Sequence, residues 1–262
     1  MNLGPFNSVI AVVAEAMRQG RIGFALQQVN SVVDLSDVLY SECLGRLVES
    51  DGAVRTSGEF IAGLQAARCA PVFDRHLIGL AFDWLADHPA RVLGCNISTE
   101  NIADEENRTV LYDLLSGHSA IASRFVLEFT ESSPILTSSV AAELFQSIRA
   151  LGYRIAVGFG TGHLSPEALL SIPIDIIKID ALSVQQSCDE GERFLRHLVG
   201  LASCAAPTVV VEGIETYAQF EAARAAGATH VQGVLLSEPT LPPVYCGWMN
   251  PFQEAMAAKS PM

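Results

Sequence analysis

Positive charge is scarce in this sequence. Its 262 residues include 16 lysines and arginines against 29 aspartates and glutamates, which gives a formal net charge of −13 and an isoelectric point near 4.8. An acidic protein repels the phosphate backbone of nucleic acids and the headgroups of anionic membranes. We therefore expect no nucleic-acid polymer as a partner and no membrane insertion. An anionic ligand would need a local arginine, lysine or bound metal ion.

Paired metal-ligand and redox motifs are also absent. The six cysteines form no CxxC pair, and the six histidines show no HExxH spacing. The cysteines are Cys43, Cys69, Cys95, Cys188, Cys204 and Cys246. Isolated cysteines in or beside apolar runs are usually buried free thiols. The sequence therefore predicts free thiols, and it gives no support for a zinc site.

Long apolar runs and linker-like stretches are missing too. The first positive charge is Arg18, so no basic segment precedes an apolar one as in a secretory leader. The apolar run Val9 to Met17 is too short to cross a bilayer. These features predict one cytoplasmic domain over residues 1–262. Its expected parts are an N-terminal helix in 1–20, a barrel in 21–240 and a C-terminal tail or helix in 241–262.

The sequence does contain an alternation of strand-like and helix-like segments. The expected strands are 22–29, 38–48, 91–98, 124–130, 153–157, 174–179, 208–211 and 229–236. The expected helices are one capped by Asn7 or Ser8, then 58–68, 73–87, 104–117, 138–151, a short one near Ser165, 189–203 and 216–226. Eight strands in an α/β alternation favour a closed (β/α)8 barrel over an open sheet.

Polar side chains stand at the ends of five successive strands. They are Asn96, Glu128, Lys178 with Asp180, Glu212 and Gln232. Each has an ordinary alternative explanation: the asparagine as a turn former, the glutamates as acids facing a helix N-terminus, and the lysine as a solvated strand end. Because functional groups of a parallel barrel gather at the carboxyl ends of its strands, the five together indicate one shared site.

The second expected strand adds a further carboxylate. Glu42, Leu44 and Arg46 are two residues apart and so share one face of the strand. A partly exposed cross-strand ion pair is the alternative explanation for this pattern. Three carboxylates and an amide form an oxygen-rich set that suits Mg²⁺ or Mn²⁺ better than zinc. A lysine beside such a set would hold a water molecule or a phosphate oxygen.

Residues 153–180 contain two expected strands with a glycine-rich turn between them. A strand over Tyr153 to Val157 enters a glycine-rich turn at 158–162, and the next apolar run carries Lys178 and Asp180. In a parallel α/β arrangement the turn and this lysine and aspartate should face the same site.

Seven short motifs, in order along the chain, resemble those of the EAL-domain family, the cyclic di-GMP phosphodiesterases of bacterial signalling. The motifs are Glu42-Cys43-Leu44-Gly45-Arg46, Asn96-Ile97-Ser98, Glu128-Phe129-Thr130-Glu131, Phe159-Gly160-Thr161-Gly162, Lys178-Ile179-Asp180, Glu212-Gly213-Ile214-Glu215 and Gln232-Gly233. The resemblance extends from about Met17 to Thr240. It implies a modified TIM (β/α)8 barrel of EAL type whose first strand runs antiparallel.

The resemblance also implies roles for single residues. The ligands of a first Mg²⁺ or Mn²⁺ ion would be Glu42, Asn96 and Glu128. Catalysis would use Lys178, which orients the nucleophilic water, and Glu212, which acts near the metals as ligand or base. The contacts to the dinucleotide would be Gln27, Leu44, Arg46 and Gln232. Glu131 would stabilise the loop that follows the strand 153–157.

One departure from the family pattern affects the expected chemistry. The family has two consecutive aspartates before its FGTG motif, whereas Val157 and Gly158 precede Phe159 here. A two-metal centre holds its cations roughly 3.5–4 Å apart, and neither valine nor glycine supplies a ligand for that purpose. We expect the second metal to be lost, the first to be weakened or absent, and hydrolysis to be lost or very slow. A smaller departure is Cys43, where the family has alanine.

Three functions remain open on these grounds. The first is a non-catalytic EAL domain that binds cyclic di-GMP as an effector in bacterial signalling. The second is a protein-interaction scaffold that no longer binds the nucleotide. The third is a weak metal-dependent phosphodiesterase. A protein partner fits the first two, and a homodimer fits all three.

Overall fold

The computed structural model describes residues 5–130, 134–159, 169–170, 172–180 and 188–239. The strands in these ranges are β1 Ile22–Ser31, β2 Val38–Val48, β3 Val54–Thr56, β4 Leu93–Ile97, β5 Phe125–Phe129, β6 Arg154–Phe159, β7 Ile176–Asp180, β8 Thr208–Glu212 and β9 His230–Gln232. The helices are α1 Pro5–Arg18, α2 Ile61–Ala66, α3 Ala70–Asp87, α4 Glu100–Ala103, α5 Glu105–Ser116, α6 Ser139–Ala150, α8 Cys188–Ala205 and α9 Tyr217–Ala226. Single 3₁₀ turns are η1 Ser57–Glu59, η2 Ser119–Arg124 and η3 Pro134–Thr137.

The strands close into a barrel. Their order is β1-β9-β8-β7-β6-β5-β4-β2-β3, and β1 also pairs with β2. β1 runs antiparallel to both of its neighbours, while β2 and β4 to β9 pair in parallel. β3 pairs only with β2 and lies outside the closed ring. The predicted eight-stranded barrel with an antiparallel first strand is therefore confirmed.

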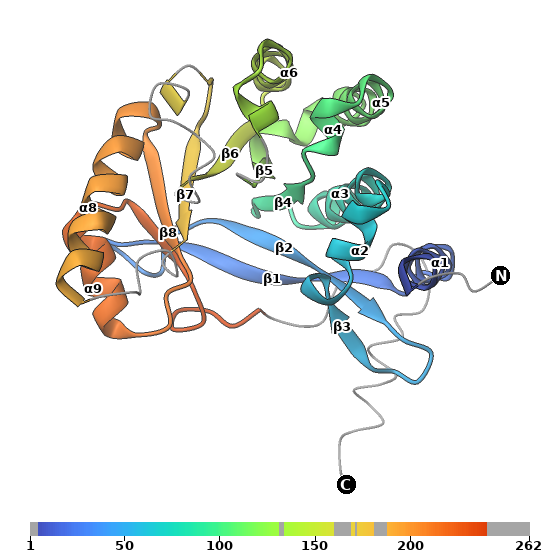
Figure 1. The fold of residues 1–262 in the computed structure, drawn as a ribbon, viewed down its shortest axis with the longest axis horizontal. Coiled ribbons are helices and arrows are strands. Elements are labelled where there is room, and N and C mark those ends of the chain that lie inside the picture. The colour runs from blue at the N-terminus through green and yellow to red at the C-terminus, as the bar shows by residue number, and fades with distance from the viewer. Residues whose placement is uncertain (1–4, 131–133, 160–168, 171, 181–187, 240–262) are drawn as a thin grey trace, which may run out of the picture.

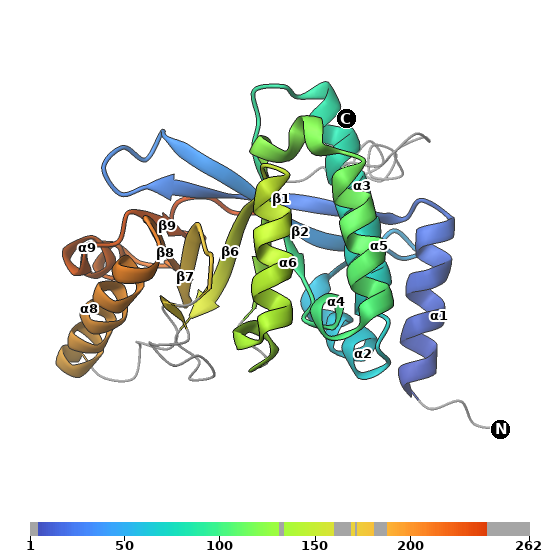
Figure 2. The same cartoon turned by 90° about the horizontal axis from the view of Figure 1, so that it is seen from above.

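Helices cover the outside of this barrel. Figure 1 shows α8 and α9 beside β7 and β8, and α3 to α6 beside β4 to β6. Figure 2 shows α3, α5 and α6 side by side in one layer. Local sequence sets several helix ends: Asp104, Ser138 and Thr216 cap α5, α6 and α9 through their side chains, and Gly227 ends α9 with a left-handed φ of 96°. No helix in the described part of the chain is long and apolar enough to span a membrane.

The apolar side chains form two layers because neighbours along a strand point to opposite faces. The larger layer joins the outer face of the sheet to the helices and includes Phe125, Leu127, Val157 and Ile177. The smaller layer fills the lower part of the barrel interior. It consists of Val29, Tyr40, Val126, Ala156, Ile176 and Val210. Polar groups lie above this inner layer, toward the carboxyl ends of the strands.

Several element bounds differ from the sequence-based expectations. β6 continues through Gly158 to Phe159, so the turn does not begin at Gly158 as predicted, because that residue pairs with Lys178 in the ladder between β6 and β7. The expected helix 58–68 is divided into η1 and α2 at Phe60, whose φ of −132° is not helical. β3 and α4 were not anticipated. α1 begins at Pro5, two or three residues before the expected caps, in agreement with the preference of proline for the first helical turn.

The last strand is shorter than expected for a steric reason. β9 ends at Gln232, because Gly233 then packs directly on the backbone of Ile214: a Cβ at Gly233 would overlap the carbonyl oxygen and amide nitrogen of that residue. Ile214 donates its amide hydrogen to the carbonyl of Gln232 at 3.0 Å and accepts one from Leu235 at 3.1 Å. This contact fixes the loop after β8 against the loop after β9. The expected short helix near Ser165 and the expected C-terminal part 241–262 lie outside the described residues.

We predict that Gly233→Ala destabilises the fold. The added methyl group meets backbone atoms that cannot rotate away, so we expect a loss of about 1–3 kcal/mol in the free energy of unfolding. Gly79→Ala in α3 and Gly200→Ala in α8 are matched controls, since a Cβ at either position meets nothing within 4 Å. The controls should gain about 0.5–1 kcal/mol from reduced unfolded-state entropy and better helix propensity. Urea unfolding measures all three, and equal effects at the three positions would contradict the steric account.

Candidate ligand site at the carboxyl ends of the strands

The strand register gathers the predicted polar residues inside the upper barrel. Gln27 lies opposite Glu42, Asn96 opposite Glu128, and Gly158 opposite Lys178. Glu212 lies opposite Asp180, and Gln232 opposite Val29 on β1. The side chains that sequence analysis placed at separate strand ends therefore share one region.

Lys178 is the centre of this group. Its Nζ lies 2.8 Å from Glu42 Oε2, 2.5 Å from Glu128 Oε2 and 3.1 Å from Glu212 Oε2. The lysine is only 5% exposed, and Glu42 and Glu128 are also buried, whereas the Glu212 side chain is about one third exposed. The alternative explanations of a solvated lysine and of helix-facing glutamates are therefore wrong.

Amide side chains extend the cluster toward β1, β4 and β9. Asn96 donates Nδ2 to Glu42 Oε1 at 2.5 Å, and Gln232 donates Nε2 to Glu42 Oε2 at 2.7 Å. The same Gln232 amide reaches Gln27 Oε1 at 3.3 Å, and Gln27 donates to the carbonyl of Ser237 at 3.0 Å. Glu42 is thus held by three donors from three strands, which explains its ionised state in a buried place.

Burial and charge give the glutamates different protonation behaviour. Burial raises the pKa of Glu128 to about 8, with a contribution from the Glu42 charge, and the Lys178 ammonium offsets this only partly. At Glu42 burial also raises the pKa, but the Lys178 charge and the three hydrogen bonds outweigh it and the net pKa is lowered. Burial lowers the pKa of Lys178, and the Glu128, Glu212 and Glu42 charges outweigh it, so this pKa stands well above its usual value. At neutral pH Glu128 therefore keeps its proton, Lys178 is an ammonium and Glu42 is a carboxylate.

A cavity of about 220 Å³ opens above these groups. It is lined by Glu42, Asn96, Glu128, Phe129, Thr130, Ala156, Gly158, Lys178 and Glu212. The two β6 residues that face it, Ala156 and Gly158, carry no ligand atom. Val157 points the other way and is fully buried in the outer apolar layer.

The donor set does not match a metal centre in this arrangement. The oxygen atoms Glu42 Oε2, Glu128 Oε2 and Glu212 Oε2 all contact the Lys178 ammonium, and β6 adds no carboxylate. Among the residues that the structure describes, no group of three or more His, Cys, Asp or Glu side chains could hold a metal ion.

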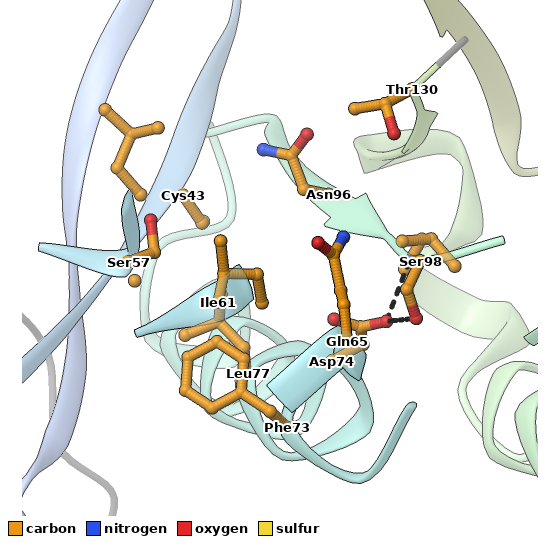
Figure 3. Close-up of a pocket in the computed structure, with 13 residues that line it drawn as sticks. Cys43, Ser57, Ile61, Gln65, Phe73, Asp74, Leu77, Asn96, Ser98 and Thr130 are labelled. Carbon is orange, nitrogen blue, oxygen red and sulfur yellow. Dashed lines mark hydrogen bonds between the residues drawn. The ribbon is translucent and has the colours of Figure 1, made fainter. Parts of the chain in front are cut away.

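Two further cavities adjoin the first. One, of about 350 Å³, has Gln27, Leu44, Asp180, Glu215 and Gln232 in its lining and shares Glu42 and Glu212 with the carboxylate cavity. The other, of about 200 Å³, is drawn in Figure 3 and shares Asn96 and Thr130 with the carboxylate cavity. Leu44 lines both outer cavities. Each outer cavity thus shares two lining residues with the carboxylate cavity.

A buried acid in the 200 Å³ cavity was not anticipated from the sequence. Asp74 of α3 accepts hydrogen bonds from the backbone amide and the hydroxyl of Ser98 (Figure 3), and also from Nδ2 of Asn101. Burial raises its pKa to about 7, against the effect of these hydrogen bonds. Its only sequence signal is a charged residue on the apolar face of the 73–87 helix, next to Phe73 and Leu77.

Gly94 of β4 is a second residue that sequence analysis missed. A Cβ there would overlap Glu128 Oε1 and the ring of Tyr40, whose Cε2 atom would lie 2.6 Å away. Glu128, whose register partner on β4 is Asn96, therefore has room for its side chain because Gly94, two residues earlier on β4, has none. Gly94 faces inward beside Glu42 in the register between β2 and β4.

Two predicted contact residues lie at the rim and one lies outside the described residues. Leu44 faces the outer cavities, as its shared strand face with Glu42 predicted. Glu42 pairs with Lys178 of β7 in a buried position, so the partly exposed cross-strand pair considered as the alternative is not what forms there. Arg46 Nη1 donates to the carbonyls of Leu44 and Gly45 at 3.0 and 2.9 Å. Glu131, the expected loop-stabilising residue, is outside the described ranges.

We predict that Glu128→Gln reduces the pH dependence of stability. A carboxyl whose pKa is about 8 in the fold and about 4.5 when unfolded binds a proton only in the fold between these values, so its contribution is lost as pH rises through about 8. Asp74, whose pKa burial raises to about 7, also makes the fold less stable as pH rises, and its effect ends at a lower pH. The wild type should lose stability up to pH 8, while the variant, which mimics the protonated acid, should level off near pH 7. Urea unfolding from pH 5 to 9 tests this, with Glu143→Gln on the exposed face of α6 as control. Parallel wild-type and variant curves would contradict the assignment.

Comparison with known proteins is consistent with the fold and the motifs. Cyclic di-GMP phosphodiesterase PA2567 of Pseudomonas aeruginosa is 31% identical over 179 residues, covering 67% of this chain and 30% of that protein. Probable cyclic di-GMP phosphodiesterase PdeA of Escherichia coli is 26% identical over 207 residues, covering 76% of this chain and 28% of that protein. The chain thus spans about 30% of the length of these relatives.

Solved structures match over most of the chain. The EAL domain of FimX from Pseudomonas aeruginosa, bound to c-di-GMP, has a TM-score of 0.76 and 25% identity, covering 90% of this chain and 96% of that one. Vibrio cholerae LapD S helix-GGDEF-EAL in its apo form has a TM-score of 0.81 and 20% identity, covering 90% of this chain and 58% of that one. The second likeness concerns the fold alone.

The family comparison covers most of the sequence. The model of the EAL domain matches residues 11–239, which include the barrel and every described cluster residue. The chain belongs to the EAL-domain family.

Proposed function

We propose that this chain binds cyclic di-GMP as an effector in bacterial signalling and does not hydrolyse it. One observation carries the proposal: the inward position of β6 beside Lys178 is Gly158, so the ammonium holds the three carboxylates and no β6 carboxylate completes a metal centre. Membership of the EAL-domain family supports cyclic di-GMP as the ligand. The residues of the cluster support the absence of hydrolysis.

The missing carboxylate argues against two-metal hydrolysis. Such a mechanism needs ligands that hold one cation near the attacking water and another near the leaving oxygen. Val157 faces the outer apolar layer, so restoring a ligand there would not reach the cavity. One oxygen atom of each remaining carboxyl group contacts the Lys178 ammonium, while Glu128 Oε1 is buried without a hydrogen-bond partner.

The charge of the cluster is compatible with an anionic ligand. With Glu128 protonated, the cluster carries one negative charge fewer at neutral pH than it would with that carboxyl group ionised. Arg46, at the rim beside Leu44, adds a guanidinium that can meet a phosphate. The proton on Glu128 and this arginine lower the repulsion that a cyclic dinucleotide with two phosphates would otherwise meet.

The shape of the site suits a ligand with two bases. The two outer cavities each share lining residues with the carboxylate cavity. Each base can enter one outer cavity while the phosphate ring spans the centre. Gln27 and Gln232 offer amides on one side, and Ser57 and Asp74 offer a hydroxyl and a carboxyl on the other. The complex of the FimX EAL domain with c-di-GMP, 25% identical to this chain, supports the same ligand.

We predict binding without turnover. Isothermal titration with cyclic di-GMP should give micromolar or tighter affinity in EDTA and in Mg²⁺, with the nucleotide recovered intact. Gln27→Ala should weaken binding about tenfold, since a hydrogen bond to a polar ligand contributes about 1–1.5 kcal/mol. Gln28→Ala is the matched control, because that side chain belongs to the outer face of β1 and lines a different cavity. No binding in either buffer would favour the scaffold, and linear product formation would favour the weak phosphodiesterase.

We also predict a gain of metal binding on restoring one carboxylate. Gly158→Asp places an inward acid beside Glu128 and Lys178, so affinity for Mn²⁺ should rise at least about tenfold, as one added charged ligand contributes on the order of 1.4 kcal/mol or more. Val157→Asp is the matched control: it adds the same charge one residue away in an apolar layer, so it should cost stability and add no metal affinity. Titration calorimetry with Mn²⁺ compares the two. Equal Mn²⁺ affinity in wild type and Gly158→Asp would contradict the role given to this position.

A further inference from the structure

A cavity on the outer face of the sheet lies apart from the carboxylate cluster. Its volume is about 370 Å³, within the roughly 300–1,000 Å³ that small-molecule sites occupy. Gln28 of β1, Ser41 of β2 and Leu93 of β4 are register partners across three strands, and all three line it. Because strand side chains alternate, Gln28 and Ser41 stand on the opposite side of the sheet from Gln27 and Glu42. We call this space the β1–α3 cavity, and the sheet separates it from the site that holds Glu42.

Charge distinguishes the β1–α3 cavity from the three cavities at the ligand site. Each of those contains at least one aspartate or glutamate in its lining. The described lining of the β1–α3 cavity contains none, and Arg91 supplies it with a guanidinium. Asp83, Asp87 and Glu238 are its neighbours in sequence, but they are exposed and lie outside the lining. In a chain with a formal net charge of −13, this cavity is therefore suited to an anion.

Three hydrogen-bond donors of this lining have no partner among the residues that the structure describes. They are the Ser41 hydroxyl, Gln28 Nε2 and the Arg91 guanidinium. Ser41 is only 9% exposed, so its hydroxyl is largely shielded from bulk water. A buried donor without a partner is unfavourable, and an acceptor on a ligand would remove that cost. One guanidinium beside two neutral donors matches the single charge of a carboxylate.

Apolar and aromatic side chains form the rest of the wall. Leu26 and Leu236 line it beside Trp84 of α3. The Trp84 and His88 rings stack with centroids 3.8 Å apart and an interplanar angle of 9°, and His88 Nδ1 donates to the Trp84 carbonyl at 2.8 Å. Two parallel rings held in this way present a flat surface against which a planar ligand ring can pack. The wall therefore favours a ligand with an aromatic body.

Arg124 holds the loop that carries His88 and Arg91. Its Nη1 donates to the carbonyls of Leu85, His88 and Arg91 at 3.2, 3.1 and 3.4 Å. These bonds fix the connection between α3 and β4. A cavity whose wall is already fixed requires less ordering of the protein when a ligand binds. The exposed Arg91 side chain can then close on a bound carboxylate from a fixed backbone position.

We propose that the β1–α3 cavity is a second ligand site, which binds an aromatic monocarboxylate. The carboxylate accepts hydrogen bonds from Ser41, Gln28 and Arg91, and the ring packs on Leu26 and Trp84. A neutral ring of the same shape loses the ion pair, whereas a dianion leaves one charge without a partner. None of these five side chains lines the three cavities of the nucleotide site, so this inference does not rest on the proposed function.

Titration calorimetry of the full chain tests the site with benzoate, 1-naphthoate and indole-3-acetate, each compared with its neutral amide. We expect at least one acid to bind with a dissociation constant below about 1 mM, and its amide to bind at least about tenfold more weakly, because the amide lacks the charge-assisted hydrogen bonds. Absence of saturable binding for all three acids, or equal affinities for an acid and its amide, would overturn the proposal.

Two variants locate the binding. Arg91→Gln and Ser41→Ala should each weaken binding of the acid at least about fivefold, and Arg91→Gln should leave the amide unaffected. Arg196→Gln on the exposed face of α8 removes the same charge elsewhere and should change neither affinity. Thermal unfolding checks that each variant is folded, and the exposed Arg91 provides the test if Ser41→Ala does not fold. Full affinity in Arg91→Gln, or an equal loss in Arg196→Gln, would overturn the proposal.

Cyclic di-GMP separates this inference from the proposed function. Excess nucleotide should not displace the acid, since the sheet lies between the two sites. Displacement would place the acid in the nucleotide site and overturn this inference. A chain that does not bind the nucleotide overturns the proposed function and leaves the result with the acids standing.

Discussion

The ammonium group of Lys178 is the interaction on which the upper barrel depends. It joins carboxylates from β2, β5 and β8, three strands that do not neighbour one another in the ring. Breaking a buried ion pair by removing one partner typically costs about 3–5 kcal/mol, because the other charge is left uncompensated. The Lys178 charge opposes the protonation of Glu128 and favours the ionised form of Glu42, which in turn accepts hydrogen bonds from Asn96 and Gln232. Tyr40 and Val126 below it close the barrel with apolar contacts.

Gly158 determines which ligand atoms the cluster lacks, because it contributes no side chain to the cavity. The same strand position could carry a ligand, since it points inward between β5 and β7, yet it adds only space. Oxygen atoms that would otherwise attract a divalent cation are satisfied by a lysine. The result is a concave site to which β6 contributes no carboxylate.

The strand order and the convergence of the site could be predicted from sequence because both follow from local patterns. Apolar runs marked the strands, and Asn96, Glu128 and Glu212 each ended one of them, so a parallel barrel had to bring them together. Gly158 was wrongly placed in a turn because glycine is a poor strand former, and only the pairing with Lys178 on β7 overrides that preference. Asp74, Gly94 and the raised pKa of Glu128 could not be anticipated, since each depends on contacts between elements far apart in the chain.

A crystal structure of the chain grown with Mn²⁺ and cyclic di-GMP tests the central claim most directly. The account predicts intact nucleotide across the carboxyl face, Lys178 Nζ still within ion-pair distance of Glu42 and Glu128, and no anomalous manganese peak beside them. Two manganese peaks roughly 3.5–4 Å apart in that cavity, as in a two-metal centre, would contradict it.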